Sequence, residues 1–127
     1  MSQAVLEHVN FTVPDAPATA RWLCEVFDWK VRWQGAARSG GQSIHVGSDD
    51  DYLVVFTPKD GSLPSTSSGD ATGAMNHIGI VVDDLDAVEV KVKAQGYATF
   101  NHADYEPGRR FYFEDENGIE FEVVSYD

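Results

Sequence analysis

The chain has 127 residues, which is enough for one compact domain with a core of ordinary size. Its formal net charge of -12 argues against nucleic acid or an anionic membrane surface as a partner, since both are bound through Lys and Arg. No apolar run approaches the roughly 20 residues that span a bilayer, and the single cysteine, Cys24, excludes an internal disulfide and a thiolate-rich metal site.

The first predicted elements are a strand and a helix. Residues 5–13 alternate, with apolar residues such as Phe11 on one side and polar residues on the other, which is typical of a strand with one buried face. Asp15 can cap the following helix, whose second position is Pro17. Apolar residues recur at helical spacing to about residue 27, so we expect the helix to cover the apolar face of the strand.

Three further strands complete the first half of the chain. They are predicted at residues 29–34, 42–46 and 52–57. After them, residues 58–74 are rich in Ser, Gly and Thr and show no periodicity, so they form a linker or a lid over a site. The first module, about 4–57, is therefore strand, helix and three strands.

The second half of the chain repeats the first. The sequence MNHIGIVVDD at residues 75–84 matches LEHVNFTVPD at residues 6–15 with an offset of 69, which aligns His77 with His8. Later the offset becomes 68, and YLVVF of the first half then lies on EFEVV of the second. The sequence therefore predicts a duplicated fold.

The second module, about 75–127, has the same predicted order of elements. A helix begins at Asp83 or Asp84; the alternating valines that follow would also suit a strand, but their position in the repeat favours the helix. The predicted strands are residues 76–82, 97–101, 110–114 and 119–125.

A βαβββ unit that occurs twice in this length resembles the vicinal oxygen chelate superfamily, which includes glyoxalase I, extradiol dioxygenases, fosfomycin-resistance transferases and bleomycin-binding proteins. The resemblance covers essentially the whole chain. Its most specific elements are the His of HVNFTV and of HIGIVV and the closing segment DENGIEFEVV. It implies an α+β fold in which two βαβββ modules pair into a curved mixed sheet around a metal or ligand cavity, with residues 1–127 as one domain.

In this superfamily the metal ligands come from the first and last strands of each module. Carried over to this sequence, the resemblance implies His8, His77 and Glu122 as ligands, while the fourth position falls on Val54, which cannot bind metal. Strand alternation supports the triad, because each of the three side chains points away from the apolar side of its strand. The set suits Fe2+ best, and Zn2+, Mn2+, Ni2+ or Co2+ could occupy it. The alternative is a metal-free relative whose polar pocket holds an organic ligand.

The missing fourth ligand bears on the activity that the resemblance implies. The resemblance to glyoxalase I implies four metal ligands, with a carboxylate in each module, so Val54 counts against glyoxalase activity. Extradiol dioxygenases and fosfomycin transferases use two His and one Glu. Tyr112, ten residues before Glu122, is similar to a dioxygenase Tyr that contacts bound substrate. Against this, DDY at residues 50–52 lacks the dioxygenase acid/base His, and Asn10 stands where fosfomycin transferases have Thr.

Five residues complete the predicted site as catalytic or substrate-binding groups. Arg109 and Arg110 are adjacent, and one could clamp a carboxylate or phosphate of the substrate; a solvated or structurally paired role is the alternative. His102, in the predicted loop NHADYEPG, could act as an acid or base, or could be an exposed loop histidine. Tyr112 is the second catalytic candidate, and Asn10 is a third substrate-binding candidate.

One further histidine, His45, is expected to lie outside the site. The repeat alignment places His45 on Phe113 and not on Tyr112. Its side chain should therefore face away from the cavity, and we do not expect it to bind the metal.

The function that these observations favour is a divalent-metal-dependent, dioxygenase-like enzyme acting on a small oxygen-rich substrate. The alternatives are a non-catalytic binding or resistance protein of the bleomycin-binding type, and a glyoxalase- or fosfomycin-transferase-like lyase or transferase. We expect a homodimer, because short relatives with two modules usually pair. The start of the chain lacks a basic, apolar secretory signal, so we expect a soluble cytoplasmic protein.

Overall fold

The computed structural model describes residues 2–64, 69–105 and 108–127. The chain divides into two compact units, Met1–Leu63 and Pro64–Asp127. Each unit holds a four-stranded mixed sheet and one α-helix, which confirms the predicted α+β class with two βαβββ modules. The pairing of these modules around a shared cavity stays a prediction.

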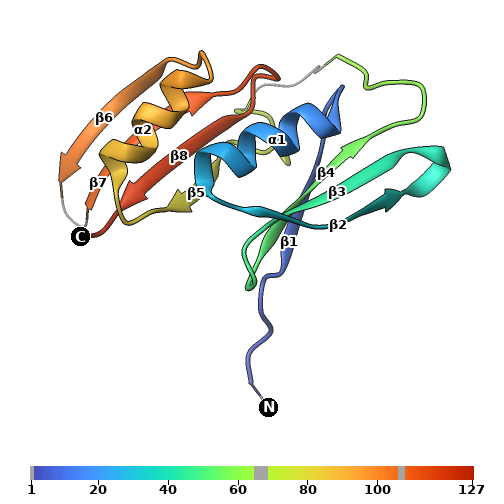
Figure 1. The fold of residues 1–127 in the computed structure, drawn as a ribbon, viewed down its shortest axis with the longest axis horizontal. Helices are drawn as coiled ribbons and strands as arrows, with labels where there is room; N and C mark the ends of the chain where they lie inside the picture. Colours follow the sequence, from blue (N-terminus) through green and yellow to red (C-terminus); the bar gives the residue numbers. More distant parts are fainter. Residues whose placement is uncertain (1, 65–68, 106–107) are drawn as a thin grey trace. The chain divides into compact units, whose positions relative to one another are not determined.

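Unit 1 is a mixed sheet with a helix on one face (Figure 1). The sheet has the order β1-β4-β3-β2; β1 runs parallel to β4, and the other pairs are antiparallel. Its elements are β1 (His8–Thr12), α1 (Ala16–Phe27), β2 (Lys30–Ala36), the short 3-10 helix η1 (Arg38–Gly40), β3 (Gln42–Gly47) and β4 (Tyr52–Thr57).

The helix α1 begins and ends where the local sequence allows it. Asp15 accepts a hydrogen bond from the backbone N–H of Ala18 at 3.1 Å and caps the first turn. Asp28 takes the left-handed conformation, with φ of 58°, and ends the helix. Buried Leu23 and Val26 then join the apolar face of the sheet to form the core of unit 1.

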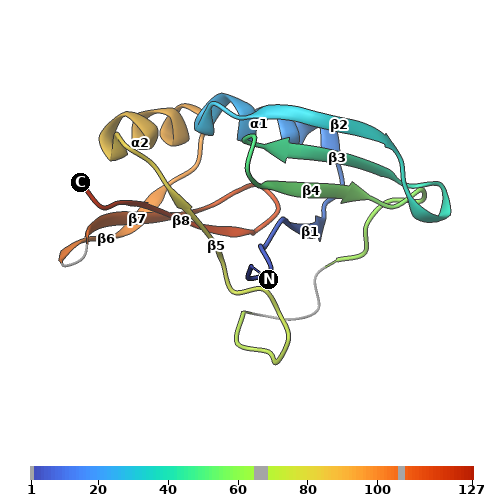
Figure 2. The ribbon, with the colours of Figure 1, turned by 90° about the horizontal axis from the view of Figure 1, so that it is seen from below.

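Unit 2 repeats this architecture with a sheet of order β5-β8-β7-β6, in which β5 runs parallel to β8. Figure 2 shows both sets of strands from below. The valine-rich segment is helical, as predicted, and Asp84 caps it by accepting from the backbone N–H of Ala87 at 3.1 Å. No helix in the described part of the chain is long and apolar enough to span a bilayer. The elements of unit 2 are β5 (Ile78–Val81), α2 (Leu85–Ala94), β6 (Thr99–Tyr105), β7 (Gly108–Glu114) and β8 (Glu120–Ser125).

The segment that follows residue 101 differs from the sequence prediction. It was expected to be a loop, which is wrong for residues 102–105, because β6 continues to Tyr105 and pairs there with Gly108. A side chain at Gly108 would put its Cβ 2.2 Å from the carbonyl oxygen of Ser125, so only glycine lets the strands approach this closely. Residues 106–107 of the expected loop and 65–68 of the expected linker lie outside the described residues.

Candidate metal centre

Each sheet has one face covered by its helix and one open face. In unit 2 the register places Glu122 of β8 opposite Tyr112 of β7. Neighbouring residues of a strand point to opposite faces. Because Phe113 and Phe121 are fully buried in the core of unit 2, Tyr112 and Glu122 lie on the open face.

His77, which immediately precedes β5, lies beside Glu122. Its Nε2 atom is 3.0 Å from Glu122 Oε1. The His77 side chain is 34% exposed and the Glu122 side chain 14%, so a ligand can reach the imidazole while the carboxylate is largely shielded from water. The two predicted ligands of unit 2 therefore lie together.

Asn76 determines which nitrogen of His77 carries a proton. The Asn76 amide donates from Nδ2 to the Gly69 carbonyl at 3.4 Å and presents Oδ1 to His77 Nδ1 at 2.8 Å. An amide oxygen only accepts, so Nδ1 donates and the Nε2 lone pair faces Glu122. Two acceptors at this distance need a cation or a proton between them. Two ligand atoms at right angles, each about 2.1 Å from a divalent metal, lie about 3.0 Å apart, so the spacing fits a metal.

Arg110 of β7 holds the second oxygen of Glu122. Its Nη1 donates to Glu122 Oε2 at 2.9 Å, and its guanidinium carbon lies 5.0 Å from the ring centre of Tyr105. Within the described residues, Nε and Nη2 of Arg110 are buried and have no hydrogen-bond partner. Arg110 therefore orients Glu122 and retains two donors for another acceptor.

Tyr112 is a hydrogen-bond donor beside the same carboxylate. Burial raises the pKa of Tyr112, and the charge of Glu122 and a hydrogen bond to it raise this pKa further. The hydroxyl consequently keeps its proton at neutral pH. The ring of Tyr112 meets that of His77 edge-on, with 5.9 Å between the ring centres.

In unit 1, the Nδ1 atom of His8 is held by the preceding side chain, as the Nδ1 atom of His77 is in unit 2. Its Nδ1 lies 2.9 Å from Oε1 of the preceding residue, Glu7. A carboxylate accepts, so Nδ1 donates and Nε2 is left for a ligand. The hydrogen bond with His8, followed by one with Tyr52, lowers the pKa of Glu7, which therefore stays charged. A carboxylate or amide oxygen behind the imidazole is the usual support of a metal-binding histidine.

A row of four rings crosses the open face of the sheet in unit 1. The ring centres of His8 and Tyr52 are 5.2 Å apart, those of Tyr52 and His45 are 4.9 Å apart, and those of His45 and Trp33 are 5.0 Å apart. The Arg32 guanidinium lies over the Tyr52 ring at 4.3 Å. These contacts hold the rings in fixed orientations on the face that carries His8.

The predicted orientation of His45 is wrong. His45 pairs with Val54, and Val54 pairs with Asn10, so all three lie on the open face with His8. Asn10, a predicted substrate-binding residue, therefore shares the face of His8 and follows it by two residues. Burial lowers the pKa of His45, which is neutral at neutral pH as a result.

The cause of this error is the length of one turn. Strands β3 and β4 are joined by four residues, 48–51, whereas β7 and β8 are joined by five, 115–119. The offset between the halves is therefore 67 before the turn and 68 after it. The structural counterpart of His45 is Tyr112 and not Phe113.

Among the residues that the structure describes, neither unit alone holds a complete set of metal ligands. The described residues contain no group of three His, Cys, Asp or Glu side chains that could hold a metal ion. Unit 2 supplies His77 and Glu122. In unit 1 the strand position equivalent to Glu122 is Val54, whose side chain has no donor atom, and His8 is the ligand type that its first strand offers.

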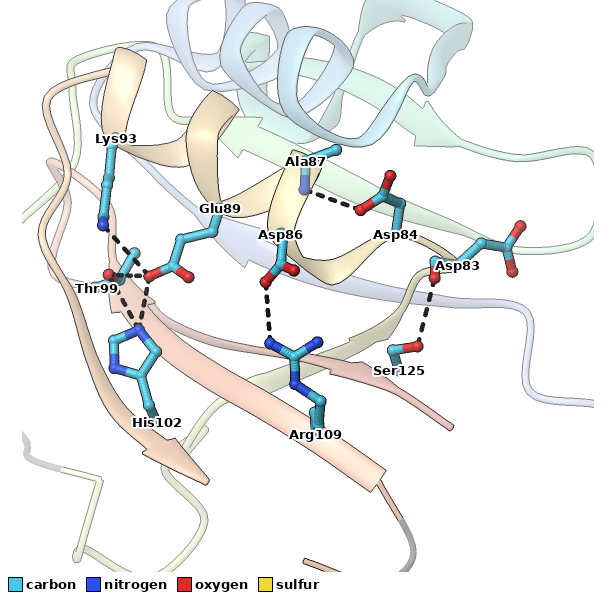
Figure 3. A network of polar contacts seen from close by, with 10 residues as sticks. All are labelled: Asp83, Asp84, Asp86, Ala87, Glu89, Lys93, Thr99, His102, Arg109 and Ser125. Carbon is cyan, nitrogen blue, oxygen red and sulfur yellow. Dashed lines mark hydrogen bonds and ion pairs between the residues drawn. The ribbon is translucent and has the colours of Figure 1, made fainter. Parts of the chain in front are cut away.

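Two other predicted site residues, His102 and Arg109, contact α2 (Figure 3). His102 Nε2 lies 2.6 Å from Glu89 Oε2, and Arg109 Nη2 donates to Asp86 Oδ1 at 3.0 Å. These contacts tie β6 and β7 to the helix, on the face opposite to Glu122. Catalysis by His102 and substrate binding by Arg109 stay predictions.

A bulge in β6 explains the position of His102. The register shifts between Phe100 and Ala103, and Asn101 has a positive φ of 52°. Phe100 and Ala103 both pair with residues of the open face, so the extra residue turns His102 to the helix side. A regular strand would have pointed His102 to the open face.

Comparison with known proteins is consistent with this fold. Residues 5–123 match the family model described as Glyoxalase/Bleomycin resistance protein/Dioxygenase superfamily. No curated protein matches the chain significantly.

Several solved structures share the fold at low sequence identity. A glyoxylase/bleomycin resistance protein/dioxygenase domain from Frankia sp. EAN1pec is 22% identical with a TM-score of 0.83, and the match covers 99% of this chain and 100% of that chain. FosX from Listeria monocytogenes, in complex with Mn(II) and sulfate, is 17% identical with a TM-score of 0.74, over 98% and 93% of the two chains. FosX from Mesorhizobium loti is 22% identical with a TM-score of 0.73, over 97% and 92%.

Proposed function

The chain belongs to the Glyoxalase/Bleomycin resistance protein/Dioxygenase superfamily, and from that premise we propose that it is a divalent-metal-dependent enzyme acting on a small oxygen-rich substrate. The proposed protein ligands are His8, His77 and Glu122. Fe2+ is the favoured metal, because two imidazoles and one carboxylate suit it. Mn2+ is the first alternative, since a FosX structure of the same fold holds Mn(II).

The observation that carries the proposal is the contact between His77 Nε2 and Glu122 Oε1 at 3.0 Å. Asn76 occupies the other ring nitrogen of His77, and Arg110 occupies the other oxygen of Glu122. Both facing atoms are therefore oriented as acceptors, and a proton or a cation must lie between them. A divalent cation satisfies both.

His8 is the proposed third ligand. The support is its likeness to His77, because both imidazoles open a module and both have Nδ1 bound by the preceding side chain. Since neither unit holds three ligands by itself within residues 2–64, 69–105 and 108–127, the proposal requires an imidazole from unit 1. That imidazole belongs to the same chain or to a second copy.

The chemistry follows from the ligands and from the groups beside them. A divalent cation bound there would polarise substrate oxygens as a Lewis acid. Arg110 keeps Glu122 oriented by donating to its second oxygen. Tyr112 keeps its proton at neutral pH and can donate it in a hydrogen bond to Glu122 or to a substrate oxygen. Neutral His45 offers an acceptor nitrogen on the open face of unit 1.

Metal analysis of matched variants tests the proposal. Protein purified without chelators should contain one divalent metal ion per site, measured by elemental analysis. His77→Ala and Glu122→Gln should each lose the metal, because each removes a ligand, and metal affinity should fall by more than roughly 100-fold. His102→Ala and Glu114→Gln, which alter a helix-bound His and an exposed strand Glu, are the controls and should keep it. Full metal content and activity in Glu122→Gln would remove the proposal.

A second candidate function is fosfomycin resistance, favoured by the FosX structures that share the fold. The three-ligand set suits it as well as dioxygenase chemistry, while Val54 counts against a four-ligand glyoxalase. Consumption of fosfomycin in the presence of Mn2+ and cleavage of a catechol in the presence of Fe2+ and air distinguish the two activities. Ligand binding that survives chelator treatment, without turnover of either compound, would favour the alternative of a non-catalytic binding protein.

A further inference from the structure

The open face of unit 1 contains a hollow of about 450 Å³, within the usual size range of a small-molecule site. Asn10 and Thr12 come from β1, Ser43 from β3 and Phe56 from β4, and their side chains share this face because Thr12 and Ser43 both pair with Phe56. The turn between β2 and β3 covers one side. The lining residues are Asn10, Thr12, Ala37, Arg38, Ser43 and Phe56.

Glycine allows the turn that carries Arg38 to approach Phe56. A Cβ at Gly41 would lie 2.7 Å from a carbon of the Phe56 ring and 2.7 Å from the Thr57 carbonyl oxygen, so no other residue fits there without a shift. Gly40 has a positive φ of 79°, which glycine adopts without strain. The backbone conformation at Gly40 and Gly41 therefore places Arg38 at the hollow.

The polar side chains of the hollow are available to bind a ligand. In the described part of the chain, no hydrogen bond or ion pair involves the side chain of Asn10, Thr12, Ser43 or Arg38. Thr57, on the neighbouring part of β4, shows the contrast: its hydroxyl donates to the Val13 carbonyl and accepts from the Ala16 N–H. The four free side chains can all donate hydrogen bonds.

The charge of the hollow differs from that of the chain as a whole. The chain carries a net charge of -12, yet none of the described residues that line this hollow is acidic, and one of them is Arg38. An adjoining hollow of about 200 Å³ shares Arg38 and Phe56 and adds Lys59 and Asp60. Two of the nine basic residues of the chain therefore flank one aromatic ring.

We propose that this hollow binds the oxyanion, a carboxylate or a phosphonate, of a small organic acid. Arg38 supplies the charge and a two-pronged donor, Asn10 and the Thr12 and Ser43 hydroxyls supply neutral donors, and Phe56 contacts the apolar part of the ligand. Asn10 follows His8 by two residues on the same face, roughly 6–7 Å along the strand. The assignment of this acid as the substrate rests on the proposed function; the oxyanion site does not.

Calorimetric titration of the full chain with three ligands of similar shape tests the site. Phenylphosphonate and benzoate carry the two oxyanions, and neutral benzamide is their control. We expect one or both anions to bind roughly tenfold or more tightly than benzamide, and the stronger anion identifies the oxyanion. Arg38→Gln should weaken anion binding by roughly tenfold or more, and Arg38→Lys by less. Arg21→Gln makes the same charge change on the exposed face of α1 and should bind as the wild type does.

The outcomes separate this site from the metal proposal. Anion binding that persists in chelator-treated protein and is lost in Arg38→Gln supports the site even if no variant ever binds metal. Anion binding that is lost in Glu122→Gln and unchanged in Arg38→Gln shows that the metal holds the anion, and it overturns the site. Benzamide binding as tightly as the anions also overturns it. Thermal unfolding of Arg38→Gln, an exposed turn variant, verifies that the fold is retained.

Discussion

Glu7 and Asn76 stand directly before the two histidines that open the modules, and each offers an oxygen to the Nδ1 atom of its neighbour. They are separated by the repeat offset of 69, so the arrangement occurs at the same place in both halves. One residue is a carboxylate and the other an amide, yet both accept the Nδ1 proton. The preserved property is the acceptor and not the charge.

The acceptor at position 76 should control metal affinity. Asn76→Ala removes the oxygen that fixes the His77 tautomer, so we expect the affinity for Mn2+ to fall by roughly 10- to 100-fold. Asn76→Asp keeps an acceptor at the same place and should retain most of the affinity. Titration of metal-free protein with Mn2+ measures both variants. Equal affinity in Asn76→Ala and wild type would show that the tautomer is not set by this residue.

At the scale of single residues, the sequence predicted the contact between His77 and Glu122 only through strand alternation and the family resemblance. The supporting residues were missed, although the repeat alignment places Glu7 on Asn76 and so contained the signal. Alternation along β7 places Arg110 on the same face as Tyr112, so the sequence also contained the signal for which arginine faces the open side. The contact of Arg110 with Glu122 could not be predicted, because it depends on the register between β7 and β8.

The helix α2 is tied to the edge of its sheet by a polar cluster on Glu89. Thr99 and His102 of β6 both contact the Glu89 carboxylate (Figure 3). Lys93 lies one turn further along the helix, and its Nζ atom is 3.7 Å from Glu89 Oε2. Burial by itself would raise the pKa of Glu89, but the hydrogen bonds from Thr99 and His102 outweigh it, and the net shift is downward. The cluster therefore stabilises the charged carboxylate.

This cluster predicts a pH dependence of stability. A carboxyl group with a lowered pKa in the folded state stabilises the protein above its ordinary pKa of 4.5, and this contribution is lost as the pH falls through the folded-state value. Glu89→Gln should therefore lower the free energy of unfolding by about 1 kcal/mol at neutral pH and by much less in acid. Urea unfolding at several pH values measures the difference. Glu114→Gln, at an exposed position, is the control, and an equal loss in acid and at neutral pH would contradict the prediction.

At the scale of elements, the sequence predicted the helices and most strands, because apolar periodicity and capping residues such as Asp15 and Asp84 are local signals. It failed for two features that add or remove one residue. The bulge at Asn101 and the shorter turn at 48–51 each reverse the facing of nearby side chains. The turn explains why His45 was misplaced, and the bulge turns His102, which was expected in a loop, to the helix side of its sheet. Neither irregularity leaves a periodic pattern in the sequence.

At the scale of the whole molecule, the internal repeat and the family resemblance predicted the fold class, which the structure confirms. Offsets of 69, 67 and 68 in successive segments report a shared architecture even where single positions slip. The homodimer was inferred because short relatives with two modules usually form dimers, and it stays a prediction.

The predicted homodimer has a direct test. Exposed apolar side chains, including Leu6, Trp33 and Val81, are available for burial against a second copy. Light scattering on a sizing column should give a mass of about 28 kDa, twice the 14.0 kDa of the chain, across a wide range of concentrations. A mass that stays at that of a single chain throughout this range would contradict the prediction.

The unequal turns have a consequence for how the two halves are compared in evolution and in design. An alignment of the two halves must open a gap inside the turn between residues 47 and 52. If the gap is placed outside this turn, residues of the open face in one half are aligned with residues of the helix-covered face in the other half along an entire strand. A symmetrical ancestor rebuilt from two copies of the second half would carry a glutamate where Val54 now stands, and it would thereby offer a pair of carboxylates where the present chain has one.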